Sequence, residues 1–182
     1  CHTHFNVGCE VFEDVPIIYS PGNFYFPYPE FGGSQKGCWK TGYLSKFYCD
    51  EKGVYAVELQ PYKFDMTSIA ALSPEDEKMF FEYYEKISSV IQDPEMIRRY
   101  FEAWCTWSGI SYLSCLNKDN WPPDWTRREV VKSWLPARNL FTCEAHNDLM
   151  KQTLRLIEEH RVDEAKQLQD EVLALQNPPW MK

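Results

Sequence analysis

The sequence lacks several features that would define a class of protein at once. It has no apolar run near the ~20 residues that a membrane-spanning helix needs, and no charged-then-apolar leader opens it. It also has no cluster of Lys and Arg, and its formal net charge is −8 at pH 7. Because binding to nucleic-acid phosphates requires clustered positive charge, we expect no nucleic-acid partner. Because no apolar run is long enough, we also expect no transmembrane segment in this part of the protein.

Cysteine pairs and nucleotide-binding loops are missing as well. Seven cysteines are scattered along 182 residues without a CxxC pair, so free thiols are expected rather than a disulfide framework. Free thiols lean towards the reducing cytoplasm, but they leave the localisation unknown. No Gly-rich loop is present to hold a phosphate, and no Ser-His-Asp or Cys-His arrangement indicates a nucleophilic enzyme.

The composition is that of a soluble globular domain. Hydrophobic residues make up 44% of the chain, aromatic residues 16% and charged residues 25%, which excludes a disordered polar segment. The chain opens at Cys1 without an initiator Met, and a candidate site lies within its first four residues. We therefore expect a fragment whose N-terminal part is missing.

Strand signals fill the first third of the sequence. Residues 15–20 form a β-branched run, and the Pro-Gly-Asn sequence at 21–23 predicts a tight turn at the end of that strand. Residues 41–48 and 54–59 flank the turn residues 50–53, which predicts a β-hairpin.

Helix signals fill the rest of the chain. Ser73 is a good N-cap, followed by Pro74 and three acidic residues, and it predicts a helix that ends near residue 91. Asp93 and Pro94 repeat this pattern for a second helix. Paired prolines near residue 122 must interrupt regular structure, and residues 138–176 are strongly helical in pattern.

His2 and His4 are the candidate metal ligands. In an extended segment, residues two apart project to the same side, so both imidazoles can reach one metal ion or a pair of ions. The spacing alone does not distinguish a ligand pair from two exposed histidines near a terminus.

The residues around this pair resemble the last sequence block of CapA-type capsule-synthesis proteins, relatives of the calcineurin-like metallophosphoesterases. In that family an H-x-H turn leads to a V-x-G-x-E-like strand, a K-P-I strand and the sequence Y-S-L-G-N-F. Here His2-Thr3-His4 is followed by VGCEV at residues 7–11 and by PIIYSPGNF at residues 16–24, in the same order and spacing. Weaker similarity extends over most of the chain.

The resemblance implies an α/β fold and a role in biosynthesis of a capsule such as poly-γ-glutamate. Residues 1–72 would be the C-terminal half of a metallophosphoesterase-like α/β sandwich, and residues 73–182 a helical extension of the same domain. His2 and His4 would bind two divalent ions, Mn, Fe or Zn, whose other ligands are absent from this chain. Two such ions can clamp an oxyanion and lower the pKa of a bridging water.

The resemblance also implies a substrate site near residues 21–24. Gly22 permits close backbone approach, Asn23 can hydrogen-bond to substrate or to a ligand histidine, and Phe24 opens an aromatic stretch suited to a substrate wall. The implied partners are an anionic polymer or its precursor and the missing N-terminal half of the domain. A plain turn at 21–23 is the alternative.

Departures from the family pattern leave the activity open. Cys1 stands where phosphoesterases have Gly, and it is either a soft metal ligand or a substituted turn residue. Pro21 replaces the usual Leu. We therefore expect a metal-dependent hydrolase of phosphoester or amide bonds, with a non-catalytic scaffold or polymer-binding component of capsule assembly or export as the alternative. His146 and His160 are expected to be ordinary surface or capping residues.

Overall fold

The computed structural model describes residues 3–27, 37–114 and 138–181. The chain forms two compact units: unit 1 contains Cys1–Ile97 and Ala174–Lys182, and unit 2 contains Arg98–Leu173. Among the described residues, every strand lies before residue 72 and every α-helix after it. The predicted mixture of helices and strands is therefore confirmed.

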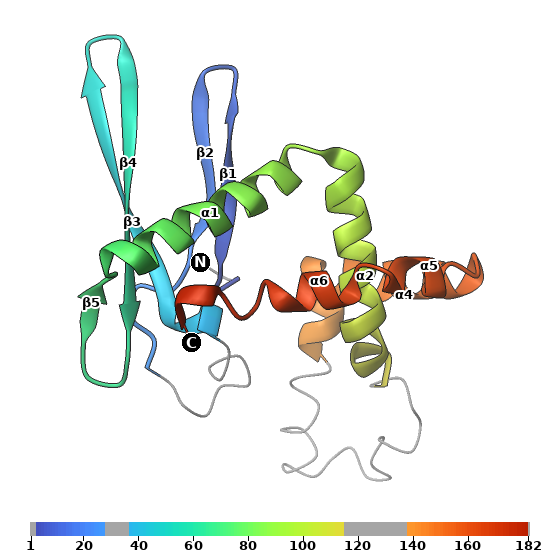
Figure 1. Cartoon of the computed structure of the whole chain (residues 1–182). Coiled ribbons are helices and arrows are strands. Elements are labelled where there is room, and N and C mark those ends of the chain that lie inside the picture. The colour runs from blue at the N-terminus through green and yellow to red at the C-terminus, as the bar shows by residue number, and fades with distance from the viewer. Residues whose placement is uncertain (1–2, 28–36, 115–137, 182) are drawn as a thin grey trace. The chain divides into compact units, whose positions relative to one another are not determined.

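Unit 1 contains two small antiparallel sheets (Figure 1). The first is a hairpin of β1 (Asn6–Phe12) and β2 (Val15–Pro21), and the second has the order β3 (Thr41–Asp50), β4 (Gly53–Phe64), β5 (Ile69–Ala71). Glu13 and Asp14 turn the first hairpin with φ angles of 47° and 65°, the left-handed backbone that favours a two-residue hairpin turn. The hairpin predicted across residues 50–53 is present as β3 and β4.

Residues 21–23 do not form the predicted tight turn. β2 continues to Pro21, and Gly22 forms an isolated antiparallel bridge with Gly42, which joins the end of β2 to the start of β3. Gly22 has a φ of 82°, and a Cβ there would lie 2.5 Å from Asn6 Oδ1 and 2.6 Å from the Thr41 carbonyl oxygen. Both the backbone angle and the close approach of three strands require glycine at this position.

Helix α1 (Pro74–Ile91) packs against β1 and begins as the sequence predicts. The Ser73 hydroxyl accepts a hydrogen bond from the Asp76 amide at 3.1 Å, which caps the first turn. Near the other end of the helix, Ser88 Oγ accepts a hydrogen bond from the Cys9 amide at 3.1 Å. The outer edge of β1 is therefore covered by α1.

The core of unit 1 is built from aromatic rings. Tyr43 of β3 packs on Phe80 and Tyr84 of α1, with ring centroids 5.9 Å and 5.2 Å apart. Trp180, in the short 3₁₀ helix η4 (Pro179–Met181), contacts Phe80 at 5.3 Å and donates its indole N–H to Thr41 Oγ1 at 3.3 Å. The end of the described chain thus packs into the same core as the strands.

Unit 2 is helical. It contains most of α2 (Pro94–Leu113), α4 (Glu144–Glu158), α5 (Val162–Lys166) and nearly all of α6 (Gln169–Ala174). Cys105, Leu149, Leu156 and Ala165 form its buried apolar cluster. Gly109 lies against Thr153 so closely that a Cβ on Gly109 would be 1.9 Å from the Thr153 hydroxyl oxygen. This close contact sets the spacing between α2 and α4.

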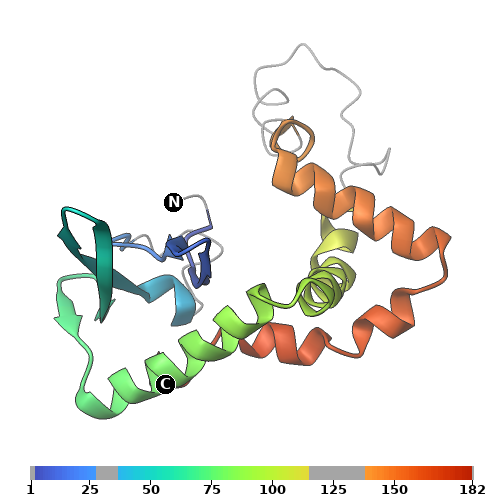
Figure 2. The same cartoon turned by 90° about the horizontal axis from the view of Figure 1, so that it is seen from above.

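Two predictions about the helical region need refinement. The tail predicted over residues 138–176 is divided into separate helices (Figure 2), and His160 breaks it between α4 and α5 with a left-handed φ of 57°. The proline-interrupted segment near residue 122 lies outside the described residues. The sheets are small and antiparallel. The metallophosphoesterase-like α/β sandwich and the boundary between its C-terminal half and the helical extension at residue 72 therefore stay predictions.

The described cysteines are free thiols, as expected; Cys38 and Cys105 are buried, whereas Cys49 is exposed. No helix in the described ranges combines the length and the apolar character needed to cross a membrane.

Candidate functional site

The structure brings His4 and Asn23 together. His4 precedes β1 and Asn23 follows β2, so the antiparallel pairing of these strands places both residues at the same end of the hairpin. His4 Nδ1 lies 2.7 Å from Asn23 Oδ1. The predicted hydrogen bond between Asn23 and a candidate ligand histidine is therefore present. His2 lies outside the described residues.

The hydrogen bonds of Asn23 define which His4 nitrogen carries the proton. Asn23 Nδ2 donates to the Trp39 carbonyl oxygen at 2.9 Å, so the amide must present its oxygen to His4. That oxygen only accepts, and His4 Nδ1 must therefore be the donor in the 2.7 Å bond. In the neutral imidazole, Nε2 then keeps its lone pair. Such an orientation by the far nitrogen is typical of metal-binding histidines.

Aromatic rings hold the His4 imidazole. The Trp39 ring stacks on it with centroids 4.5 Å apart and an interplanar angle of 18°. The Phe26 ring lies at a tilt to it, with centroids 5.2 Å apart and an interplanar angle of 54°. His4 also has a left-handed φ of 61°, an uncommon backbone for a residue other than glycine. Stacking, hydrogen bonding and backbone together fix one orientation of the ring.

The Asn23 side chain is itself rigidly placed. Asn23 is 7% exposed, and its backbone carbonyl accepts a hydrogen bond from the Tyr62 hydroxyl at 2.8 Å. Burial raises the pKa of Tyr62 to about 12, so this hydroxyl keeps its proton and remains a donor at neutral pH. Tyr62 of β4 and Trp39 of the short 3₁₀ helix η1 (Gly37–Lys40) thus support an amide that lies just after β2.

Ser20 ties the start of β1 to the end of β2. Its hydroxyl donates to the Phe5 carbonyl oxygen at 2.6 Å and accepts a hydrogen bond from Thr3 Oγ1 at 3.0 Å. Ser20 is fully buried. The chain on both sides of His4 is therefore anchored to the strand that leads to Asn23.

The other predicted substrate residues have different roles. Gly22 forms the bridge to Gly42, which joins the end of β2 to the start of β3. Phe24 is 65% exposed and lies edge-on to the Tyr62 ring, with centroids 6.0 Å apart. No hydrogen bond or ring contact joins either residue to His4 among the described residues. Trp39 and Tyr62 complete the site, and no signal near the histidines in the sequence identifies them.

His4 is a single candidate ligand in this part of the structure. The residues that the structure describes contain no group of three His, Cys, Asp or Glu side chains that could hold a metal ion. The imidazole, with its free lone pair and its fixed far nitrogen, fits one position in a metal's coordination shell. The remaining donors would have to come from His2 and from residues beyond the described ranges.

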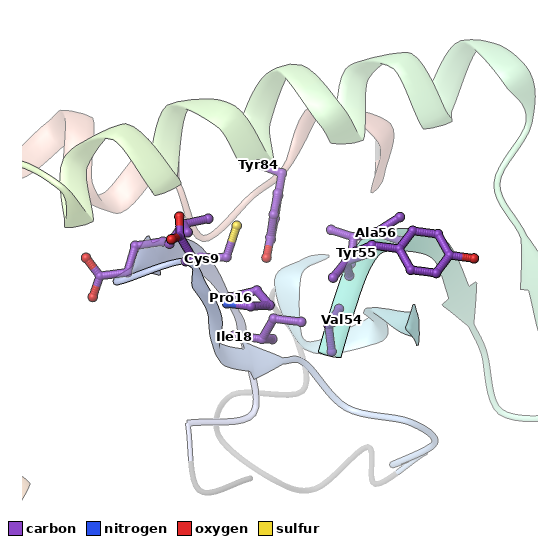
Figure 3. Close-up of a pocket in the computed structure, with 12 residues that line it drawn as sticks. Cys9, Pro16, Ile18, Val54, Tyr55, Ala56 and Tyr84 are labelled. Atoms are coloured by element: carbon purple, nitrogen blue, oxygen red, sulfur yellow. The ribbon is translucent and has the colours of Figure 1, made fainter. Parts of the chain in front are cut away.

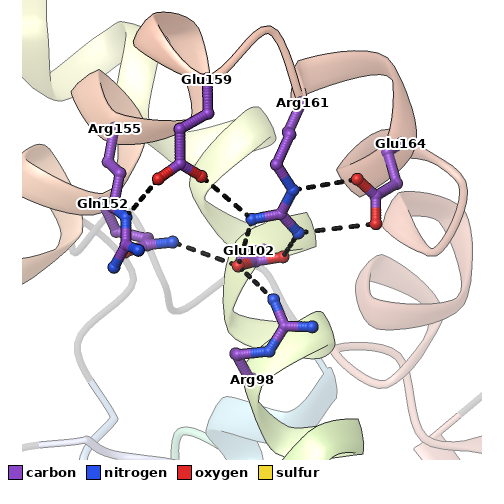
Figure 4. Close-up of polar contacts among 7 residues, drawn as sticks. All are labelled: Arg98, Glu102, Gln152, Arg155, Glu159, Arg161 and Glu164. Atoms are coloured by element: carbon purple, nitrogen blue, oxygen red, sulfur yellow. Dashed lines mark hydrogen bonds and ion pairs between the residues drawn. The ribbon is translucent and has the colours of Figure 1, made fainter.

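A second polar cluster lies in unit 2, and each of its residues has at least one polar partner in the cluster (Figure 4). Glu102 of α2 is 3% exposed and accepts hydrogen bonds from Arg98 at 2.6 Å, from Gln152 at 3.2 Å and from Arg161 Nη2 at 2.9 Å. Arg161 also contacts Glu164 at 3.0 Å. A buried carboxylate with this many donors serves to join α2, α4 and the start of α5.

No family model, curated protein or solved structure matches this chain. The function of the His4 site is therefore inferred from the contacts of its own residues.

Proposed function

We propose that this chain is the C-terminal part of a CapA-type protein of capsule biosynthesis, in which His4 and His2 are ligands of a two-metal hydrolase site. The observation that carries the proposal is the His4–Asn23 hydrogen bond of 2.7 Å, with Asn23 Nδ2 bound to the Trp39 carbonyl oxygen at 2.9 Å. These bonds leave His4 Nε2 with its lone pair, as a metal ligand requires. The substrate proposed is an anionic polymer of the poly-γ-glutamate type or its precursor.

The residues of this chain would position the ligand. Asn23 holds the imidazole tautomer, the Trp39 ring stacks on one face of the imidazole, and the Phe26 ring contacts it at a tilt. Divalent ions, when bound, supply charge that stabilises an oxyanion and acidifies a bound water. Imidazole ligands are neutral, so they hold the ions without cancelling the positive charge that an anionic substrate needs.

The fold proposal follows from the same resemblance. We infer that β1 to β5 form the C-terminal half of a metallophosphoesterase-like sandwich, whose other half supplies carboxylates and further His or Asn ligands. The Gly22–Gly42 bridge, which links the two small sheets at the end where His4 lies, supports a common layer. Residues 73–182 would be the helical extension of that domain.

The test is metal analysis of the full-length protein that contains this chain. We expect the His4→Ala and His2→Ala variants to lose bound Mn, Fe or Zn, and the His146→Ala variant, changed in α4, to keep it. Asn23→Leu should lower metal retention more than Asn23→Asp, because a carboxylate can still accept a hydrogen bond from His4 Nδ1–H. Unchanged metal content in both the His2 and the His4 variants would overturn the proposal. The non-catalytic scaffold would then be the remaining interpretation of the function.

The isolated chain offers a separate check. Two imidazoles cannot complete a coordination shell, and no described group of three donor residues can replace the missing ligands. We therefore expect the chain alone to bind divalent metal weakly in a calorimetric titration. Tight stoichiometric binding would contradict the assignment of the other ligands to the rest of the protein.

A further inference from the structure

A cavity of about 370 Å³ lies in unit 1, away from His4, between the two hairpins and α1 (Figure 3). Tyr84 projects into it from α1, and Cys9 lies beside Tyr84. Most of the lining is apolar and comes from the facing hairpins: Val11, Pro16 and Ile18 on one side, and Val54, Ala56, Val57 and Leu59 on the other. An apolar cavity of this size suits a few side chains of a ligand.

The Tyr84 side of the cavity carries no charge. The Tyr84 hydroxyl is 2.9 Å from the Tyr43 hydroxyl, so both phenols are already paired. Burial raises the pKa of Tyr84, which therefore stays protonated at neutral pH. This wall of the cavity consequently favours apolar groups over anions.

Two carboxylates, Glu10 and Asp14, also line the cavity, and none of its lining residues is Lys, Arg or His. Glu10 accepts a hydrogen bond from the Tyr19 hydroxyl. The charge of the lining excludes anionic amphiphiles such as fatty acids, and it complements a cationic group next to an apolar body.

An open strand edge borders the cavity at Ile18. The Cys9 amide points away from β2, because it donates to Ser88 Oγ on α1. Cys9 pairs with Ile18 across the hairpin, so the pair is of the non-hydrogen-bonded kind and the Ile18 N–H and C=O point away from β1. No described residue pairs with these two backbone groups. They face the side on which Gly22 joins β2 to β3.

We propose that this cleft binds an extended segment of a partner polypeptide as an added strand on β2. The backbone of the segment would pair with Ile18, its apolar side chains would fill the cavity, and one Lys or Arg would meet Glu10 and Asp14. The entrance suits this mode of binding because Val11 and Tyr55 are 69% and 67% exposed and extend the apolar surface outward. The proposal does not depend on the metal site.

The test uses two labelled synthetic peptides, SVTVKVTS and its acidic counterpart SVTVEVTS, and measures binding by fluorescence anisotropy. The lysine peptide should bind at least about tenfold more tightly, as expected for two favourable exposed ion pairs rather than two unfavourable ones. Equal binding of the two peptides would overturn the proposed role of Glu10 and Asp14.

Matched variants locate the binding. Ala56→Arg places a bulky cation in the cavity, whereas Ala70→Arg makes the same change on exposed β5, outside the cavity lining. We expect Ala56→Arg to abolish peptide binding and Ala70→Arg to retain it. Retained peptide binding in Ala56→Arg would refute the proposed site. A wild-type dimer that Ala56→Arg dissociates would also refute the proposal, because the occupant of the cavity would then be a second copy of the chain.

Amide hydrogen exchange separates strand addition from side-chain binding alone. The lysine peptide should slow exchange of the Ile18 amide by about tenfold or more, because that N–H gains a hydrogen-bond partner. Unchanged exchange at Ile18 with saturating peptide would refute strand addition.

Discussion

The two polar clusters of this protein differ in how completely their groups are used. In unit 2, both Glu102 oxygens accept hydrogen bonds from side chains on three helical segments. In unit 1, the His4 imidazole uses only Nδ1, and its partner Asn23 is held by the Trp39 carbonyl. A buried carboxylate with both oxygens paired serves stability, whereas a fixed imidazole with an unused lone pair is what the proposed metal-ligand role of His4 requires.

The largest expected effect is on the Glu102 cluster. Glu102→Ala should lower the free energy of unfolding of unit 2 by about 3 kcal/mol, because it removes a buried carboxylate that Arg98 and Arg161 need as a partner. Chemical denaturation followed by circular dichroism measures this loss. Glu158→Ala, an exposed change at the end of α4 in the same unit, should stay within about 0.5 kcal/mol. A Glu102→Ala loss as small as that would show that the cluster is not structural.

Gly22→Ala tests the Gly22–Gly42 bridge, which joins β2 to β3 next to the His4 site. The variant should lose about 2 kcal/mol, because alanine disfavours a φ of 82° and its Cβ would approach Asn6 Oδ1 at 2.5 Å. Gly53→Ala is the matched control: Gly53 also has a positive φ, 124°, but its Cβ would meet no atom within 4 Å. Urea unfolding should show the larger loss for Gly22→Ala, and equal losses would mean that the contacts of Gly22 contribute nothing.

The two clusters also differ in how far the sequence predicts them. His4 and Asn23 could be paired from the sequence, because each lies just outside one strand of a recognisable hairpin. Trp39 and Tyr62 could not, because their contact with the pair depends on how β3 and β4 pack against that hairpin. The predicted turn at residues 21–23 failed for the same reason, since a bridge to Gly42 replaces the local turn.

Local signals predicted local structure well. The Ser73 cap and the residues of the β3–β4 turn specify features that are complete within a few positions. The break at His160 was missed because the apolar pattern continues across it and only the backbone angle changes. The Glu102 cluster joins residues from separate helices, so no spacing in the sequence marks it.

A smaller effect is expected from the cap of α1. Ser73→Ala should lower the stability of unit 1 by about 1 kcal/mol, because the Asp76 amide loses its acceptor. Ser73→Asp should restore most of that stability, since a carboxylate also caps this position. Hydrogen exchange, read separately for amides of α1 and α4, should show the loss in unit 1. An equal loss in α4 would mean that the two units unfold as one.

The smallest effect is the acid response of the exposed carboxylates around Arg161. Hydrogen bonds from Arg155 and Arg161 lower the pKa of Glu159, and the hydrogen bond from Arg161 lowers the pKa of Glu164. Their folded pKa values lie below the unfolded value of about 4.3, so their stabilising effect is complete above that pH and is lost as the pH falls further. Replacing both by Gln should flatten the fall in helix stability below about pH 4.3. An unchanged acid profile would exclude their contribution.

The tautomer of His4 tests the central claim most directly. A long-range ¹H–¹⁵N correlation spectrum of the ¹⁵N-labelled chain at pH 8, where imidazoles are ordinarily neutral, assigns the proton to one ring nitrogen. We expect the proton on Nδ1 and a bare Nε2, and a loss of this preference in Asn23→Leu. A proton on Nε2 in the unmodified chain would contradict the assignment of His4 as a positioned metal ligand.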